Sequence, residues 1–269
     1  VEGNWLTDGN IAEVVIQSDR ILKYYEYIEK FIDKDAVYVC ECDPEEYKEK
    51  LSKSIPCDCR QIPKEKTLER WNKMLDGTYS PGDAVVRLKT NIDDPNPAMR
   101  DFPLARINDS DHPRQGRKYR VWPLMNLSVF VDDVELGMTH ILRGKDHADN
   151  AKRQQYMYDY LGISAPYTFF QGRINFPDLQ ISCSKTRKLI EEGQYENWDD
   201  IRLPFLAALK RRGYQPYAFV KWAASMGGSL NDKKVSGEEL FKNINFLNKE
   251  ILDSISRRYF FIKEPVPIK

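Results

Sequence analysis

A short polar run, residues 181–189, carries two serines and three basic side chains between a predicted strand and a predicted helix. Ammonium and hydroxyl groups on a short loop can neutralise phosphate charge that moves during a reaction, so this run is a candidate site for a polyphosphate. By itself the same composition is more typical of a solvated surface loop. The interpretation therefore depends on the residues that precede it.

Four of the five cysteines form two Cys-x-Cys pairs, Cys40 with Cys42 and Cys57 with Cys59. Four thiolates in two close pairs, each beside a turn, can complete a tetrahedral zinc site. Such a site would be structural, because four protein ligands leave no position open for chemistry. Disulfides are disfavoured in a reducing cytoplasm, and a degenerate former zinc site or small core thiols are the alternatives. Cys183, inside the polar run, is interpreted as a spacer.

Arg143 ends a predicted apolar strand, at the edge where open α/β sheets bind ligands. Arginine is rarely buried without an anion, so we expect its guanidinium to face a carboxylate or a phosphate. An ion pair with Asp132 or Asp133 is the alternative.

The three histidines have different expected settings. We expect His112 to face solvent, His140 to be a core residue, and His147 to lie at a strand-to-helix turn. The sequence contains no Ser-His-Asp order, nucleophile elbow, Walker loop or Gly-x-Gly-x-x-Gly. These common catalytic signatures therefore do not explain the chain.

The composition allows a sizeable core, since 41% of the residues are hydrophobic while 30% are charged. The 41 basic and 41 acidic residues cancel, so any nucleic-acid contact must come from a local patch. No apolar run approaches the roughly 20 residues that span a bilayer, and no secretory pattern is present. We predict a soluble, cytoplasmic protein. Because the sequence opens without methionine, we also expect a segment of a longer chain.

Hydrophobic periodicity predicts the elements that must position these residues. An apolar stripe at positions 21, 24/25, 28, 31 and 32 predicts a helix capped by Ser18 or Asp19. Strand–helix–strand alternation from residue 119 to 170 predicts a parallel sheet, and the chain after residue 189 is mainly helical. Helices are predicted over 20–32, 44–51, 66–75, 126–134, 148–161, 203–212, 216–226, 236–243 and 248–257, and strands over 13–17, 36–40, 83–89, 102–107, 119–123, 139–143, 166–170 and 259–262.

Five segments in the expected order resemble the archaeal-type glutamyl-tRNA synthetases and their glutaminyl relatives. Ser182-Cys-Ser-Lys-Thr186 stands where that family has Lys-Met-Ser-Lys-Ser. Three further segments are similar to the second half of a class I nucleotide-binding core: Trp122–Asp133, Gly137–His147 and Phe170–Asn175. The fifth, Glu196–Pro204 followed by Leu209–Tyr214, is similar to a helical stem-contact region.

The resemblance implies an α/β fold: the second half of a class I synthetase Rossmann-like core, with an inserted α+β acceptor-binding domain and a following α-helical stem-contact domain. The implied domains are the end of the first Rossmann half (1–18), the connective acceptor-binding insertion (19–118), the second Rossmann half (119–180), the Lys-Met-Ser-Lys-Ser-like loop with the stem-contact domain (181–258), and the start of an anticodon-binding β-barrel (259–269).

The resemblance also implies roles in the second half of the chain. Lys185, with Ser184, would stabilise the phosphates of ATP while the amino-acid carboxylate attacks the α-phosphate. Arg173 and Ile174 would lie against the adenine. Arg143 would bind the substrate's side-chain carboxylate, at a position where glutaminyl enzymes carry a small uncharged residue.

Trp122, Met125 and Asn126 would line the amino-acid pocket. Met125 and Asn126 depart from the Tyr-Asp that is common at these two positions. The cysteine pairs, Cys40/Cys42 and Cys57/Cys59, would brace the insertion with a structural Zn²⁺.

The implied function is glutamate–tRNA ligation. The implied substrates are ATP with Mg²⁺, glutamate and tRNA(Glu), and tRNA(Gln) is a second candidate. A non-catalytic module that binds the tRNA acceptor end or docks a partner is the alternative, and an aminoacyl transferase that modifies a nucleoside is a third. The family's His-Ile-Gly-His-like signature is absent from this sequence. We therefore interpret the chain as an internal segment that does not activate glutamate alone.

Overall fold

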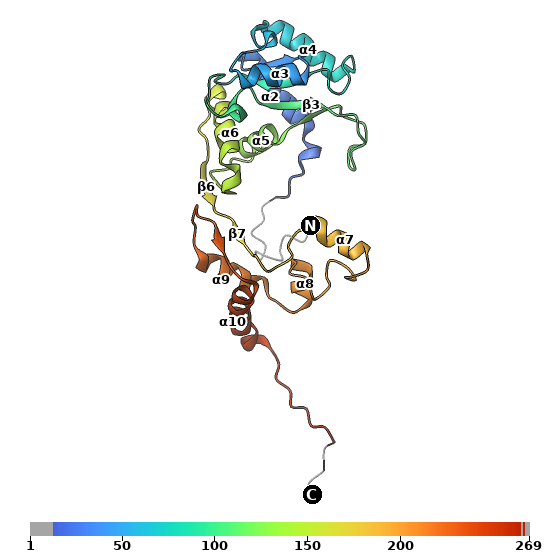
Figure 1. Ribbon diagram of the computed structural model, residues 1–269, viewed down its shortest axis with the longest axis vertical. Helices are drawn as coiled ribbons and strands as arrows, with labels where there is room; N and C mark the ends of the chain where they lie inside the picture. The colour runs from blue at the N-terminus through green and yellow to red at the C-terminus, as the bar shows by residue number, and fades with distance from the viewer. Residues whose placement is uncertain (1–12, 265, 267–269) are drawn as a thin grey trace. The chain divides into compact units, whose positions relative to one another are not determined.

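The computed structural model describes residues 13–264 and residue 266 (Figure 1). It contains two compact units, one spanning Val14–Phe170 and the other containing Gln171 and the residues after it. None of the helices in the described part of the chain is long and apolar enough to cross a membrane. The cytoplasmic location stays a prediction.

The first unit contains a four-stranded antiparallel sheet. Its strands follow the order β1 (Val37–Cys40), β2 (Val85–Leu88), β3 (Pro103–Ile107) and β4 (Val121–Pro123). Side chains alternate between the two faces of a strand, so Val86 and Leu88 of β2 are fully buried while Arg87 is half-buried. One face of the sheet therefore belongs to the core.

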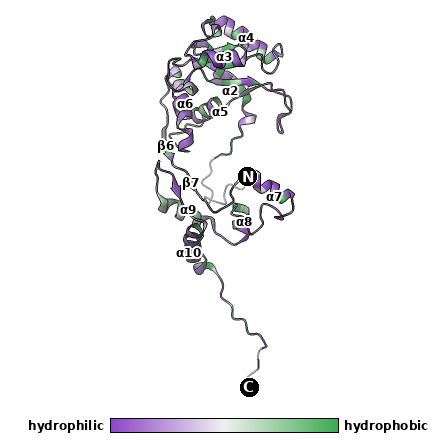
Figure 2. Cartoon of the chain, viewed as in Figure 1, coloured by the Kyte–Doolittle hydropathy of each residue, from purple (hydrophilic) through white to green (hydrophobic). Residues whose placement is uncertain are grey.

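Helices α2 (Ile21–Asp33), α4 (Lys64–Asp76) and α5 (Met125–Glu135) pack on this sheet and share one apolar core with it (Figure 2). The stripe predicted for α2 is confirmed, because Ile21, Tyr24, Ile28, Phe31 and Ile32 are all buried. The predicted cap is wrong. Arg20 occupies the N-cap position, since Gln17–Asp19 form a short 3-10 helix, η1.

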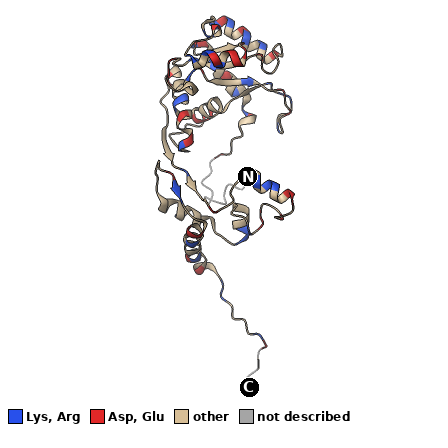
Figure 3. Cartoon of the chain, in the orientation of Figure 1, with Lys and Arg blue, Asp and Glu red and all other residues tan. Residues whose placement is uncertain are grey.

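Helix α3 (Pro44–Ser52) begins as the sequence predicts. Asp43 Oδ1 accepts hydrogen bonds from the backbone N–H groups of Glu45 and Glu46, at 2.9 and 3.2 Å. Proline at the first helical position has no N–H to leave unsatisfied. Acidic residues are prominent on this helix (Figure 3).

The predicted strand–helix–strand run is divided between two sheets. Strands β5 (His140–Gly144) and β6 (Tyr167–Gln171) pair with each other and are joined through α6 (Ala148–Leu161), as expected. However, β4 pairs antiparallel with β3, so the prediction that residues 119–123 belong to the same parallel sheet is wrong. Local periodicity indicates a strand but carries no information about which strand it will pair with.

The expectation of a core histidine at position 140 is also wrong. His140 is exposed, as is Leu142, whose side chain is 70% exposed, while Ile141 and Arg143 are half-buried. Exposed and half-buried side chains therefore alternate along β5 as in a strand, but His140 lies on the exposed face. The prediction failed because an apolar strand pattern does not show which face will be covered.

The second unit is mainly helical. Strands β7 (Ile174–Asn175) and β8 (Lys233–Lys234) form a short parallel pair. Leu209, Tyr214, Ala218 and Ile244 are the buried residues of its apolar cluster. Its helices are α7 (Cys183–Glu191), α8 (Leu206–Arg211), α9 (Pro216–Met226) and α10 (Gly237–Ile255).

Several helices and strands differ from the predicted ones in this unit and at the start of the chain. The two helices expected over 236–243 and 248–257 are one continuous helix, α10, and the helix expected over 203–212 begins at Leu206. Residues 13–17 and 259–262 are not strands. Val14 and Tyr259–Ile262 are exposed, and a strand is stable only beside a neighbour that accepts its backbone hydrogen bonds. Residues 1–12, most of the segment predicted to end the first Rossmann half, lie outside the described residues.

The core face of α2 can be tested with two substitutions on the same helix. Ile28 is fully buried, so Ile28→Ala should lower the free energy of unfolding by about 2–5 kcal/mol because it leaves a cavity. Leu22 is 60% exposed, so Leu22→Ala should change it by less than about 0.5 kcal/mol. Urea unfolding followed by circular dichroism measures both. Equal effects would show that this face does not form the core.

Candidate functional site

Four free cysteines meet where β1 ends. Cys40 ends the strand, Cys42 follows it, and Cys57 and Cys59 lie at the start of η2 (Asp58–Gln61). Their sulfur atoms all lie within 4.8 Å of one another, and the Cys40–Cys57 and Cys42–Cys59 Sγ atoms are 3.9 and 3.8 Å apart. Zinc–sulfur bonds of about 2.3 Å give a tetrahedron with sulfur–sulfur edges of about 3.8 Å. The donor set and its spacing fit a four-thiolate zinc site.

The close pairing of Cys40 and Cys57 changes the acidity of both thiols. Their hydrogen bond, together with burial, raises the pKa of Cys40. The same hydrogen bond lowers the pKa of Cys57. Cys57 is thus favoured as a thiolate, which is the form of cysteine that binds metal ions.

A buried carboxylate anchors both cysteine pairs to the sheet. Asp101 is 1% exposed and accepts hydrogen bonds from Tyr38 Oη at 2.9 Å and from Arg60 Nε at 2.8 Å. Its other oxygen accepts from the backbone N–H of Thr90 at 2.8 Å. Tyr38 lies on β1 beside one cysteine pair, and Arg60 directly follows the other. The two pairs are therefore held in place before any ligand is considered.

Arg143 is a largely buried cation that contacts α5 and α6. Its Nη1 donates to Gln154 Oε1 at 2.6 Å, and its Nη2 pairs with Asp133 Oδ2 at 3.1 Å. Asp132 instead pairs with Arg20, at 3.2 Å. Burial raises the pKa of Asp133, and the opposing effect of Arg143 is smaller. Of the two predicted settings for Arg143, the structure shows the ion pair with Asp133.

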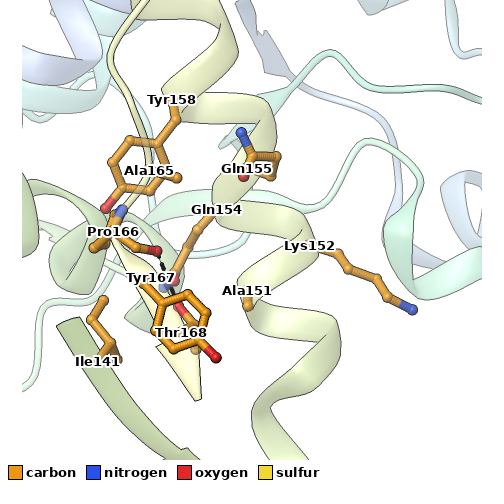
Figure 4. A pocket seen from close by; sticks show the side chains of 10 residues that line it. All are labelled: Ile141, Ala151, Lys152, Gln154, Gln155, Tyr158, Ala165, Pro166, Tyr167 and Thr168. Carbon is orange, nitrogen blue, oxygen red and sulfur yellow. Dashed lines mark hydrogen bonds between the residues drawn. The ribbon is translucent and has the colours of Figure 1, made fainter. Parts of the chain in front are cut away.

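A cavity of about 440 Å³ lies beside Gln154, and Figure 4 shows its lining side chains. Gln154 Nε2 and Tyr158 Oη are buried polar atoms without a hydrogen-bond partner among the described residues. Such atoms usually bond to protein, water or ligand. The lining residues are Ile141, Ala151, Lys152, Gln154, Gln155, Tyr158, Ala165, Pro166, Tyr167 and Thr168.

The three predicted pocket residues of the first unit lie near the junction of β4 and α5. Trp122 stacks on His112, with ring centroids 4.7 Å apart. His112, predicted to face solvent, is therefore partly covered. Met125 is exposed, whereas Asn126 is buried. Both line a second cavity of about 440 Å³, together with Leu51, Arg87, Pro97, Ala98, Arg100, Phe102, Pro103, Leu124, Asn150 and Arg153.

The polar run at residues 181–189 is mostly helix, which corrects the prediction of a loop. Ser182 caps α7, and its hydroxyl accepts from the backbone N–H of Lys185 at 3.5 Å. Ser184 and Lys185 lie in the first turn, and both are exposed. The serine that suggested a loop is a favoured N-cap residue, which is why the run can begin a helix.

Arg173 and Ile174 follow a close backbone contact. A Cβ added to Gly172 would lie 2.2 Å from the carbonyl oxygen of Asn231, so only glycine fits there. This approach lets the backbone N–H of Arg173 donate to Asp232 Oδ1 at 2.8 Å, while Ile174 pairs with Lys233. Arg173, Ile174, Ser184 and Lys185 thus belong to the second unit.

The residues that surround the cysteines could not be predicted from the sequence. Arg70 on α4 donates from Nη1 to Cys59 Sγ at 3.3 Å, and Tyr38 Oη lies 3.8 Å from Cys57 Sγ. No local pattern around Arg70 or Tyr38 indicates these contacts. They arise only when α4 and β1 pack together.

Residues 4–253 match the family described as "tRNA synthetases class I (E and Q), catalytic domain". The glutamate–tRNA ligase of Pyrococcus horikoshii is 47% identical over 258 residues, which are 96% of this chain and 45% of that protein. The glutamate–tRNA ligase of Methanocaldococcus jannaschii is 47% identical over 255 residues, 95% of this chain and 45% of that protein. The chain spans about half the length of these curated relatives.

Solved structures give the same picture of the fold. The glutamate tRNA ligase from Elizabethkingia meningosepticum, in complex with its amino acid, matches with a TM-score of 0.56 at 17% identity, over 92% of this chain and 56% of that one. The synthetase from Elizabethkingia anophelis matches with a TM-score of 0.55 at 18% identity, over 89% and 55%. The mixed helix-and-sheet fold is consistent with a segment of a class I synthetase.

Proposed function

Because the chain belongs to the catalytic-domain family of class I tRNA synthetases for glutamate and glutamine, we propose that it acts in glutamate–tRNA ligation. The reaction activates glutamate with ATP to glutamyl-adenylate and then transfers the glutamyl group to the 3′-terminal adenosine of tRNA. The observation that carries this proposal is the 47% identity to a glutamate–tRNA ligase along 96% of the chain.

In the first step, a carboxylate oxygen of glutamate attacks the α-phosphorus of ATP, and pyrophosphate leaves. In the second, a ribose hydroxyl of the terminal adenosine attacks the acyl carbon, and AMP leaves. Mg²⁺ accompanies ATP. Negative charge shifts among phosphate oxygens in the first step, so an ammonium group at Lys185 and a hydroxyl at Ser184 would stabilise the transition state electrostatically. Their exposure in the first turn of α7 leaves both accessible to a nucleotide.

Arg143 is proposed to bind the side-chain carboxylate of glutamate. A guanidinium has five N–H donors, and Asp133 and Gln154 accept from two of its nitrogens while they orient the group. A guanidinium bonds a carboxylate more strongly than a neutral amide, even though Asp133 already pairs with Arg143. This contact would select glutamate as the amino acid.

The remaining substrate contacts are proposed from the family resemblance. Arg173 and Ile174 would lie against adenine, and Trp122, Met125 and Asn126 would line the amino-acid pocket. The buried Asn126 Oδ1 has no hydrogen-bond partner among the described residues, which supports a ligand-facing role for that side chain.

The domain organisation predicted above remains part of the proposal. Residues 19–118 would form the connective insertion that holds the tRNA acceptor end, 119–180 the second Rossmann half, and 181–258 the phosphate-binding segment with the stem-contact helices. Lys210, Arg211 and Arg212 lie in or beside α8, where basic side chains suit the tRNA backbone. The partners are tRNA(Glu), with tRNA(Gln) as a second candidate.

We also propose that Cys40, Cys42, Cys57 and Cys59 hold a structural Zn²⁺. Bound zinc would crosslink the end of β1 to η2 and stabilise the folded first unit, since the unfolded chain lacks the preformed site. The sulfur–sulfur distances near 3.8 Å support this assignment.

Lys185→Ala should lower the rate of aminoacylation by about 10²–10³-fold in the full-length protein, because a charge that stabilises the transition state is lost. tRNA binding should change by less than about 3-fold. Lys188→Ala, on the same helix and also exposed, is the matched control and should keep activity. Full aminoacylation by Lys185→Ala would favour the non-catalytic module instead.

Arg143→Gln should lower kcat/KM for glutamate by at least about 100-fold, since the substrate carboxylate would lose its charged partner. Arg20→Gln removes the neighbouring ion pair with Asp132 and serves as the control. Steady-state aminoacylation by the full-length protein with varied glutamate measures both. Equal losses in the two variants would mean that the Arg143 effect is only structural.

The purified chain should contain about one equivalent of zinc by elemental analysis. Replacing either pair, Cys40/Cys42 or Cys57/Cys59, with serine should reduce the zinc to near zero. Cys183→Ser should retain it, because Cys183 is exposed and lies outside the cluster. Zinc-free wild-type protein purified in the presence of zinc would contradict the site.

A further inference from the structure

Arg70 contacts a sulfur atom of one cysteine pair and the two residues that flank Cys40 of the other pair. Its Nη1 donates to the carbonyl oxygen of Val39 at 3.0 Å and to Cys59 Sγ at 3.3 Å, and its Nη2 pairs with Glu41 Oε2 at 2.6 Å. Val39 and Glu41 are the two neighbours of Cys40 in the sequence. One guanidinium therefore connects both sides of Cys40 with a sulfur of the second pair.

The position of Arg70 is set by packing rather than by the cysteines. It lies on α4 next to Trp71, which is fully buried in the core, and α4 packs against β1. The Arg70 side chain is 13% exposed. A largely buried cation needs compensating negative charge. Glu41 supplies one, and a thiolate at Cys59 would supply a second.

Metal binding makes the cluster more negative. Four cysteines bind Zn²⁺ as thiolates, so each thiol that is still protonated releases its proton, and the loaded site has a net charge of −2. A fixed positive charge beside the sulfurs favours that product, whereas the Glu41 carboxylate opposes it. Arg70 contacts both Cys59 Sγ and Glu41. Its positive charge therefore lies beside the negative sulfur cluster and also neutralises the opposing carboxylate. An N–H donor aimed at sulfur also bonds a thiolate more strongly than a thiol.

We propose that Arg70 is a positioning residue of the metal site, and that its positive charge keeps the metal bound by stabilising the thiolates and neutralising Glu41. This inference rests on the proposed zinc site and adds a residue outside the ligand set. Partners of this kind, which hydrogen-bond to metal ligands, commonly change metal affinity by about 10–100-fold when they are removed.

Three variants distinguish the effect of the positive charge of Arg70 from the effect of its side-chain shape. Arg70→Lys keeps the charge, Arg70→Gln keeps an N–H donor but removes the charge, and Arg120→Gln is a control that removes an ion pair with Asp109 and contacts no cysteine. Each is loaded with one equivalent of zinc and mixed with an excess of a chromogenic chelator. The rate of zinc release is then followed, and circular dichroism checks that each loaded protein is folded.

Arg70→Gln should release zinc about 10–100-fold faster than wild type, while Arg70→Lys and Arg120→Gln should stay within about 3-fold. Release by Arg70→Gln at the wild-type rate would overturn the proposal, as would equally fast release by Arg70→Lys. If Arg70→Gln fails to fold, Arg70→Lys tests the proposal by itself: zinc release within about 3-fold of the wild-type rate is expected, and much faster release overturns the role of charge. If wild type binds no zinc, the metal site itself is wrong; if it binds zinc that Arg70→Gln retains, only the role of Arg70 is wrong.

Discussion

One face of the four-stranded antiparallel sheet must be shielded from water, and many other contacts in the first unit follow from how the helices do this. Helices α2, α4 and α5 cover the face with a shared apolar core. Each helix then presents polar residues at the edge of that core. Helix α4 brings Arg70 to the cysteines, α5 brings Asp133 to Arg143, and α2 brings Tyr24 to Asp132, with its hydroxyl 3.0 Å from Oδ2.

Arg143 and Arg70 show the same physical arrangement in two places. Each is 13% exposed, each has one carboxylate partner, and each contacts a further acceptor. Burying a cation costs free energy that a single ion pair does not reliably offset. An arrangement of this kind is better suited to holding a charge in a defined place than to stabilising the fold. In the proposed function, Arg143 would present its charge to a substrate and Arg70 to a metal site.

The zinc-like spacing of the cysteines depends on two levels of structure. The Cys-x-Cys pairs are visible in the sequence, and each alone brings two sulfurs close together. The buried Asp101 joins the pairs through Tyr38 and Arg60, so the four sulfur atoms converge within 4.8 Å. The four cysteines could be predicted as ligands from the sequence but the carboxylate could not, because Tyr38 and Arg60, its partners, are far from Asp101 in the sequence.

The sequence by itself determined the local elements wherever periodicity and end signals agreed. The stripe of α2, the start of α3 at Pro44 and the end of α6 at Leu161 are examples, and the ordered motifs carried the family resemblance. Only the tertiary structure decided that β4 pairs with β3, that His140 faces outward and that Arg143 pairs with Asp133. Periodicity and capping act over a few residues, which a sequence window contains. Strand pairing, the choice of covered face and the partner of a buried charge depend on residues that approach one another only when the chain packs.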